Sequence, residues 1–391
     1  LSAGRVQSVT LRLICERQDE IDKFKAQEYW IIEAELKKVK GKVQELIAKL
    51  TKINGKKANI KIEKEAENVV SELEKATYKV SQITKKEVKK NPAPPFTTST
   101  LQQTTSSRFG YSARRTMKIA QDLYERGLIT YMRTDSVNLA NSAILAIRDY
   151  IGKTFGESFL PQLPKKYKVK SKLAQEAHET IRPTNITVRE LSAGDWVETG
   201  HIKIYDLIWR RTVACQMREA VIDQVTAEIE ASSYLFSATG STVKFPGFLK
   251  VFGKEEGEEE KTLPELTQGE ILELIKLTPS QHFTKPPDAY TDGTLVKVLE
   301  TNGVGRPSTY APIISTLIER NYAERVERKL VPTDLGKIVN KFLIEKFPDI
   351  VDASFTAEME ENLDEIAKGG EDWVPVIRNF YQPFAEHLEK V

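Results

Sequence analysis

The spacing of apolar residues predicts two helices near the start of the chain. Within residues 5–24, Val6, Val9 and Leu13 recur on one side, and charged residues lie on the other. This is the period of an amphipathic helix that packs against a core. A second helix is predicted at residues 65–75.

Two segments rich in strand-forming residues flank a long helical one. Strands are predicted at residues 29–36 and 78–83, and β character returns over 220–280. In the later segment, the Thr-Gly-Ser sequence at 239–241 separates two apolar runs and predicts a hairpin turn. The simplest interpretation is one β domain, with the helical residues 97–217 inserted into it.

Capping residues mark the helices of the inserted segment. Ser112 is a typical N-cap, and Gly127 is a typical C′ residue for the helix between them. We expect Asn141 or Ser142 to cap the next helix, and a further helix is predicted near 205–217.

The chain is helical again from residue 290. Helices are predicted at 294–300, 308–320 and 334–347, with a glycine-containing break at 302–305 and a wing at 324–331. This order resembles a winged helix-turn-helix.

The composition is typical of a folded protein with several domains. The chain has 391 residues, of which 40% are hydrophobic and 29% are charged. No apolar run approaches the roughly 20 residues that a membrane span needs, and no signal peptide is recognisable. Because the sequence opens on Leu1 without an initiator methionine, we expect a fragment of a longer, cytoplasmic protein.

Local charge is more informative than whole-chain charge, which is only +2. Residues 79–118 carry nine Lys or Arg against one acid, Glu87. Such a stretch can neutralise phosphates and release their counterions, although a solvated surface is the alternative interpretation. The proline-rich residues 91–96 within it predict a linker between domains.

Several common site motifs are missing from the sequence. The Gly-Val-Gly-Arg sequence at 303–306 lacks the Gly-Lys-Ser/Thr ending of a phosphate loop, so no nucleotide-driven motor is indicated. His178 and Glu179 have no second histidine at the spacing of a zinc protease. The two cysteines, Cys15 and Cys215, are too few for a four-cysteine zinc site and are expected in the core.

Tyr131 and Arg133 form the strongest chemical signal. In an extended segment, residues two apart point to the same face, so a phenol and a guanidinium would converge on one spot. Tyrosine can attack a phosphodiester, and arginine can hold the phosphate in bidentate fashion. On these residues alone, a core aromatic in an apolar strand is the alternative interpretation of Tyr131.

Four segments in order resemble the type IA DNA topoisomerases, and bacterial topoisomerase I within that family. They are LSAGRVQS at residues 1–8, ITYMRTDS at 129–136, AHETIRPT at 177–184 and GVGRPSTY at 303–310. The PPFTT sequence at 94–98 also matches, and the resemblance spans the whole chain.

The resemblance implies an α+β, multidomain toroid. A helical tyrosine domain would be inserted into a β-rich arch, above a helical, winged-helix-like base that binds single-stranded DNA. The implied domains are 1–27 for the first part of the base, 28–93 for the first part of the arch, 94–217 for the tyrosine domain, 218–284 for the second part of the arch and 285–391 for the second part of the base.

The resemblance also implies a reaction. Tyr131 would attack a backbone phosphate of single-stranded DNA, form a 5′-phosphotyrosyl bond and release a 3′-hydroxyl. After another strand or a duplex passes through the gap, the hydroxyl reseals the break, and negative supercoils relax without ATP.

The family pattern has parts that are not recognisable in this sequence. Family members carry an acidic Toprim domain that binds Mg²⁺, and C-terminal DNA-binding modules. The resemblance therefore implies Mg²⁺ for the full-length enzyme only. For this chain it implies a monomeric core that binds DNA, with no metal of its own, no membrane partner and little or no activity in isolation.

The resemblance assigns roles to individual residues. Arg133 would contact the scissile phosphate, and His178 would lie at the active site; a surface histidine with its own hydrogen-bond partners is the alternative interpretation of His178. Asp135 would either orient Arg133 or cap the next helix, and Arg182 would either contact DNA or end a helix. Further residues expected to line the single-strand groove are Arg5, Gln7 and Arg320.

Residues 306–309 predict a phosphate-binding cradle on physical grounds as well. Pro307 fits the first turn of a helix, and a helix N-terminus offers free N–H groups and a positive dipole end. Arg306 and the hydroxyls of Ser308 and Thr309 would complete the cradle. Ordinary helix capping is the alternative interpretation.

Two other functions are compatible with the sequence. One is a decatenase of the topoisomerase III type, with the same chemistry. The other belongs to a different class and is a non-catalytic module that binds single-stranded DNA.

Overall fold

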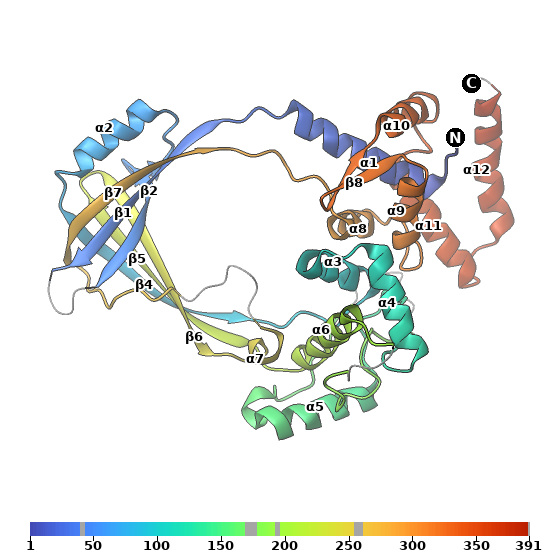
Figure 1. Ribbon diagram of the computed structural model, residues 1–391, viewed down its shortest axis with the longest axis horizontal. Helices are drawn as coiled ribbons and strands as arrows, with labels where there is room; N and C mark the ends of the chain where they lie inside the picture. Colours follow the sequence, from blue (N-terminus) through green and yellow to red (C-terminus); the bar gives the residue numbers. More distant parts are fainter. Residues whose placement is uncertain (40–43, 169–177, 192–195, 254–260, 390–391) are drawn as a thin grey trace. The chain divides into compact units, whose positions relative to one another are not determined.

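The computed structural model describes residues 1–39, 44–168, 178–191, 196–253 and 261–389 (Figure 1). The chain divides into two compact units, each built from separate stretches of sequence. We call them the helical unit and the β unit. The helical unit contains Leu1–Lys23, Ala93–Gln216 and Pro287–Val391, and the β unit contains Phe24–Pro92 and Met217–Pro286.

The β unit contains one antiparallel sheet that closes on itself. Its strands pair in the order β1-β7-β4-β5-β6-β2-β3, and β1 also pairs with β2. Strands from both sides of the inserted segment are neighbours, because β4 pairs with β5 along its length. The elements are β1 Glu28–Lys38, β2 Glu45–Ile53, β3 Lys56–Lys57, α2 Glu63–Leu73, β4 Tyr78–Lys90, β5 Ala220–Ala231, β6 Tyr234–Phe245, α7 Leu249–Phe252 and β7 Ile271–Phe283.

Alternate strand residues fill the interior of the β unit. In β1, Ile32, Ala34 and Leu36 are buried, which is the period of two expected when one face of a strand packs inward. Leu73 of α2 and Phe236 of β6 belong to the same core. Helix α2 therefore contributes an apolar side chain to the core that the strands form.

The hairpin predicted at 239–241 is wrong. Tyr234–Phe245 is one continuous strand, and the turn lies before it at Ser232, which has a left-handed φ of 56°. A Cβ on Gly240 would lie only 2.7 Å from the backbone oxygen of Lys261. Glycine is therefore needed here because the Lys261 backbone lies too close for a side chain. In a strand, such a close approach explains a glycine as well as a turn does.

In the helical unit, the first helix packs against helices from the C-terminal part of the chain. Val9, Ile14 and Cys15 of α1 belong to a core that includes residues of α8, α9 and α10. The predicted wing is confirmed as a hairpin of β8 and β9 between α9 and α10. The elements are α1 Arg5–Lys23, α8 Asp292–Thr301, α9 Tyr310–Glu319, β8 Ala323–Val326, β9 Lys329–Pro332 and α10 Asp334–Lys346.

Two C-terminal helices escape the sequence prediction: α11 (Ala353–Ala367) and α12 (Trp373–Leu388). Asp352 caps α11 by accepting hydrogen bonds from two backbone N–H groups. The buried residues of α11 are Thr356 and Glu360. Phe355, Met359, Leu363 and Ile366 recur at helical spacing, so the sequence does contain an apolar pattern from which this helix could have been predicted. No helix in the described part of the chain is long and apolar enough to cross a membrane.

The inserted segment contains the helices that frame the candidate site. Ser112 caps α4 through its side chain, and Gly127 follows that helix with a φ of 70°, both as predicted. Neither Asn141 nor Ser142 caps α5, because both lie inside its first turn and Ala140 is the N-cap. The elements are α3 Thr98–Phe109, α4 Ala113–Glu125, α5 Asn141–Phe155 and α6 Thr199–Cys215, with a short 3₁₀ turn at Glu157–Phe159.

Candidate active site

Tyr131 lies on a loop between α4 and α5, residues 128–138, which we call the tyrosine loop. Along it, Met132 and Thr134 are buried, whereas Tyr131 and Arg133 are exposed. Side chains that alternate in this way point to opposite faces. The phenol and the guanidinium therefore share one face, as their spacing in the sequence predicts.

The Tyr131 side chain is accessible to a ligand. It is 44% exposed, which excludes a core aromatic. Its ring lies edge-on against Tyr124 of α4, with 5.2 Å between the ring centroids. Among the described residues, neither the Tyr131 hydroxyl nor the Arg133 guanidinium has a hydrogen-bond or ion-pair partner. Both groups are therefore free to bind.

Thr98, the first residue of α3, holds the tyrosine loop from one side. Its buried hydroxyl lies 2.7 Å from the Met132 carbonyl and 3.0 Å from the Thr134 carbonyl, and it accepts a hydrogen bond from Thr134 N at 2.8 Å. Thr98 N donates to Thr134 O at 2.8 Å. Because buried backbone groups are costly to leave unpaired, these bonds fix the loop backbone beneath Tyr131 and Arg133.

Residues 178–184, from the third of the four motif segments named in the sequence analysis, hold the tyrosine loop from the other side. Thr130 N donates to Arg182 O at 2.9 Å, and Ile129 forms an isolated β-bridge with Pro183. Ala177, the first residue of that segment, lies outside the described residues. The two segments are thus neighbours in the fold although they are far apart in sequence.

Arg182 is bonded within the protein. Its Nε and Nη2 donate to Glu179 at 2.7 and 2.9 Å, and its Nη1 donates to the Pro183 carbonyl at 2.9 Å. Glu179 also accepts from Ala140 N at 2.8 Å, so the pair ties this segment to the start of α5. No helix ends at Arg182 in the described structure, and its bonding favours a structural function.

Asp135 brings together groups from distant parts of the chain. Burial raises the pKa of this carboxyl; His178 and Arg306 oppose the rise, and Asp364 adds to it. Asp135 does not cap α5, whose N-cap is Ala140, and no hydrogen bond joins it to Arg133 among the described residues. Its position instead links the tyrosine loop to Arg306.

Arg306 is held by internal partners. Its Nε and Nη2 donate to one Asp364 oxygen at 3.0 and 2.7 Å. Its Nη1 donates to the carbonyls of Gly303 and Gly305 at 3.2 and 2.9 Å. The guanidinium therefore joins the 303–309 turn to α11.

The 306–309 turn precedes the helix and does not form its first turn. Helix α9 begins at Tyr310, so the predicted start at residue 308 is wrong. The reason is that Thr309 Oγ1 accepts a hydrogen bond from Arg306 N at 2.8 Å and closes a turn of its own. Ser308 is exposed, and within the described residues its hydroxyl is the only side-chain group of the predicted cradle without a partner.

The other groove residues also have partners. Arg5 donates to the Thr356 carbonyl at 2.8 Å and to Glu360 at 2.5 Å. Arg320 Nη1 donates to Gln7 Oε1 at 2.7 Å. The sequence reasoning missed Glu360 and Asp364, although their i,i+4 spacing would place both on one face if the helix were predicted.

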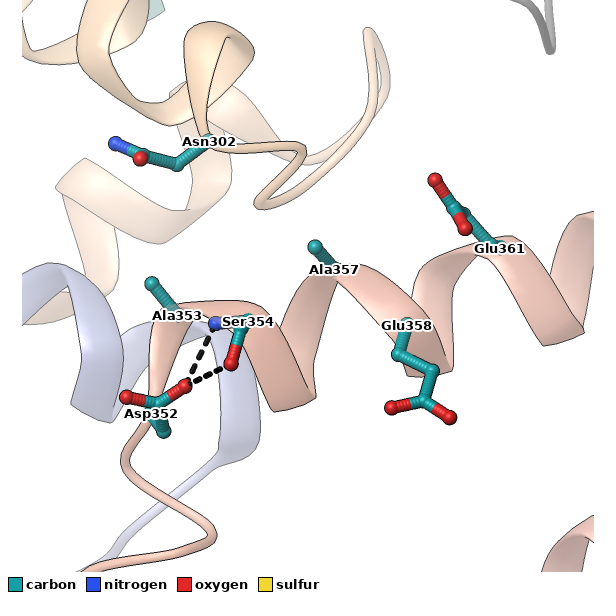
Figure 2. Close-up of a pocket in the computed structure, with 7 residues that line it drawn as sticks. All are labelled: Asn302, Asp352, Ala353, Ser354, Ala357, Glu358 and Glu361. Atoms are coloured by element: carbon teal, nitrogen blue, oxygen red, sulfur yellow. Dashed lines mark hydrogen bonds between the residues drawn. The ribbon is translucent and has the colours of Figure 1, made fainter.

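A separate pocket of about 560 Å³ lies along α11 beside Asn302 (Figure 2). Its lining includes the carboxylates of Asp352, Glu358 and Glu361. Three negative charges would repel a phosphate, so this pocket is not a DNA site. In the described part of the chain, no group of three or more His, Cys, Asp or Glu is arranged to hold a metal ion.

Comparisons with known proteins agree with this geometry. The sequence model of a family described as DNA topoisomerase matches residues 1–378. DNA topoisomerase 1 of Rickettsia felis is 46% identical over 407 residues, which cover 100% of this chain and 52% of that protein. DNA topoisomerase 1 of Salmonella typhimurium is 43% identical over 391 residues, covering 100% of this chain and 45% of that protein.

The fold comparison gives the same result. A solved structure of full-length topoisomerase I from Thermotoga maritima superimposes with a TM-score of 0.85 at 34% identity, covering 99% of this chain and 63% of that chain. The chain spans about half the length of the curated relatives it matches. From the sequence match, the superposition and the accessible tyrosine, we conclude that this chain belongs to the type IA DNA topoisomerase family, together with bacterial DNA topoisomerase I.

Proposed function

We propose that this chain is the DNA-cleaving core of a topoisomerase that relaxes negatively supercoiled DNA without ATP, with Tyr131 as its nucleophile. One observation supports the proposal above all: the Tyr131 and Arg133 side chains are accessible, although the backbone that carries them is held in place. Tyr131 and Arg133 are exposed and unpartnered among the described residues, and Thr98 bonds the loop backbone beneath them. A nucleophile held in a fixed position reacts faster than a mobile one.

The cleavage step exchanges one phosphoester bond for another. The Tyr131 oxygen attacks a backbone phosphorus, a P–O bond to tyrosine forms, and the bond from phosphorus to the 3′ oxygen breaks. The phenol loses a proton and the departing 3′ oxygen gains one, so the step is balanced. Because the number of phosphoester bonds is unchanged, the 3′-hydroxyl can reverse the reaction without ATP.

Arg133 and His178 supply the electrostatics of this step. The Arg133 fork can hold two phosphoryl oxygens at once, and its charge favours both a phenolate and the negative charge that develops on the phosphate. His178 is exposed and lies near the Asp135 carboxylate. From this position the His178 side chain would contact a neighbouring phosphate.

We also propose domains for the helical part of the chain, whose bounds differ by a few residues from those of the compact helical unit. Residues 94–217 form the tyrosine domain, and residues 1–27 with 285–391 form the base that binds a single strand, with Ser308 as an accessible hydroxyl. A passing strand or duplex is the second DNA partner. We expect the enzyme to act as a monomer in the cytoplasm.

Mg²⁺ is implied by the family, but the residues described here do not fit it. The carboxylates beside Arg306, Glu360 and Asp364, are paired with Arg5 and Arg306, and burial raises the pKa of the Asp135 carboxyl in the tyrosine loop itself. No step on this chain is therefore assigned to a metal. We expect the Mg²⁺ ligands of the full-length enzyme in a Toprim domain.

The test is a search for the covalent intermediate. This chain is mixed with a separately produced Toprim domain, Mg²⁺ and a single-stranded oligonucleotide labelled at its 3′ end. Attack by Tyr131 leaves the labelled fragment attached to protein on a denaturing gel, whereas a 5′ label is released on a free fragment. Tyr131→Phe should abolish the adduct at unchanged DNA binding.

Tyr124→Phe is the matched control, because Tyr124 is the neighbouring exposed phenol and should be dispensable for the adduct. An adduct that persists in Tyr131→Phe would show that another residue is the nucleophile. DNA binding without an adduct in any variant would favour the non-catalytic binding module. Comparing relaxation with decatenation by the full-length enzyme separates the topoisomerase I and III types.

A further inference from the structure

The proposed reaction leaves two carboxylates of α11 without a function. Asp364 receives two hydrogen bonds from Arg306, and Glu360 lies 3.8 Å from Arg306 Nη1 while it also pairs with Arg5. The Asp364 side chain is 29% exposed and the Glu360 side chain is 11% exposed. These charges interact more strongly than fully solvated ions would.

The donors of Arg306 are almost fully used. A guanidinium has five N–H groups. Four of them are occupied: two by Asp364, one by the Gly303 carbonyl and one by the Gly305 carbonyl. A bidentate phosphate contact needs two donors. Arg306 can therefore hold a phosphate in this way only if a present partner leaves.

We propose that Asp364 is an internal competitor for the DNA phosphate that Arg306 binds, and that a bound strand must displace it. This inference rests on the proposed function, since it assumes a single strand on this surface. Asp364 is the partner that leaves because a carboxylate and a phosphate are both anions that accept two parallel N–H bonds. The exchange conserves the charge-assisted bonds, whereas loss of the two carbonyl bonds would open the 303–309 turn.

Glu360 has a different function in this scheme. It is more buried than Asp364 and faces both Arg5 and Arg306. It therefore keeps a negative charge beside the two guanidinium groups when Asp364 is displaced. Asp364 is the exchangeable partner and Glu360 is a positioning residue.

The exchange takes place beside the tyrosine loop. Asp135 of that loop is close enough to interact electrostatically with both Arg306 and Asp364. A correctly placed phosphate replaces Asp364, whereas a misplaced one must compete with it. Competition of this kind reduces affinity for all strands and favours the strand that reaches Arg306 in the correct position.

The test measures binding of a fluorescent single-stranded oligonucleotide by anisotropy over a series of salt concentrations. Asp364→Asn removes the competing charge and should tighten binding about 3- to 10-fold. The slope of log Kd against log salt should steepen by about 0.7, the value for one more phosphate contact on a single strand. Arg306→Ala should weaken binding and reduce the slope, and it should do so more in the Asp364→Asn background than in the wild type.

Glu361→Gln is the matched control. It makes the same change of charge on the same helix, but Glu361 lies at the pocket of Figure 2 and is exposed. It should tighten binding by less than about 2-fold through long-range charge alone, without the change in slope. Should Asp364→Asn fail to fold, Asp364→Ser replaces it, because it also removes the competing carboxylate, and it should tighten binding in the same direction.

The outcomes separate the inference from the proposed function. If Asp364→Asn binds no more tightly than Glu361→Gln, or if the double variant with Arg306→Ala keeps the gain, Asp364 does not compete for this phosphate. The same conclusion follows if the fallback Asp364→Ser leaves affinity and slope unchanged. If the wild-type chain fails to bind single-stranded DNA at any salt concentration, the proposed function itself is wrong.

Discussion

The tyrosine loop and the 303–309 turn of the helical unit each carry an arginine. The two arginines differ in whether the guanidinium group is already bonded within the protein. Arg133 is exposed and has no partner among the described residues. Arg306 donates to Asp364 and to two carbonyls of its own turn. One segment is ready to receive a phosphate as it stands, and the other must first give up an internal bond.

The difference extends to what holds each backbone in place. The tyrosine loop is fixed by Thr98, a residue of another element, so Arg133 contributes nothing visible to its shape. The 303–309 turn is fixed partly by Arg306 itself, whose Nη1 bonds the Gly303 and Gly305 carbonyls. Substituting Arg133 should therefore change the reaction without changing the shape of the tyrosine loop. Substituting Arg306 should change both phosphate binding and the shape of the 303–309 turn.

The largest expected effect is that of Arg133→Ala on cleavage. Loss of one preorganised group that stabilises developing charge slows a reaction by roughly 10²–10³-fold. We expect that loss in the rate of adduct formation, with an unchanged melting temperature, because Arg133 makes no bond within the described protein. Arg133→Lys keeps the charge but not the fork and should recover only part of the rate. A drop in melting temperature on Arg133→Ala would contradict the comparison.

Thr98→Val should have a smaller effect, and on stability first. The variant keeps the shape of the side chain but leaves Thr134 N without its hydroxyl partner in a buried position. A buried unpaired group costs about 1–3 kcal/mol, which urea unfolding would detect. The adduct should also form more slowly, because the loop under Tyr131 is less ordered.

Thr104→Val is the control for this experiment. Thr104 lies on the same helix, and among the described residues its hydroxyl bonds only the Thr100 carbonyl one turn earlier. Its loss should change the free energy of unfolding by less than about 0.5 kcal/mol. Equal destabilisation by the two variants would show that Thr98 acts through α3 and not through the tyrosine loop.

Local patterns predict the tyrosine loop well. The shared face of Tyr131 and Arg133 follows from alternation in an extended segment, which depends only on backbone geometry. The caps at Ser112 and Gly127 follow from side-chain and backbone preferences within a single turn. Each of these features is decided by residues close together in the sequence, and each is found in the structure.

Features decided by distant residues were not predictable. The sequence marks Arg306 as a phosphate ligand, but Asp364, which occupies it, lies 58 residues later in the chain, and only the fold brings the two together. Arg182 pairs with Glu179 only three residues away, but the pair lies outside a helix, so helical side-chain spacing does not predict it. Gly240 resembles a turn residue because the close backbone of Lys261 comes from a later segment.

The smallest expected effect concerns Asp135, the residue of the tyrosine loop that interacts electrostatically with Arg306. Burial raises the pKa of the Asp135 carboxyl above its ordinary value of 3.8, and the nearby Asp364 adds to this, while His178 and Arg306 oppose it. The folded state thus disfavours the charged form, so it holds the proton more tightly than the unfolded state does. The contribution of Asp135 to stability falls as pH rises from about 4 through its raised pKa.

Asp135→Asn should remove this dependence. Compared with the wild type, the variant should gain stability at neutral pH and lose that gain as the pH approaches 4, measured by urea unfolding across this range. Glu361→Gln, which changes an exposed carboxylate, should leave the pH profile unchanged. If Asp135→Asn instead destabilises the protein at neutral pH, the attraction of His178 and Arg306 outweighs burial. The Asp135 carboxylate would then hold the tyrosine loop and the 303–309 turn together, and the two segments would not be independent.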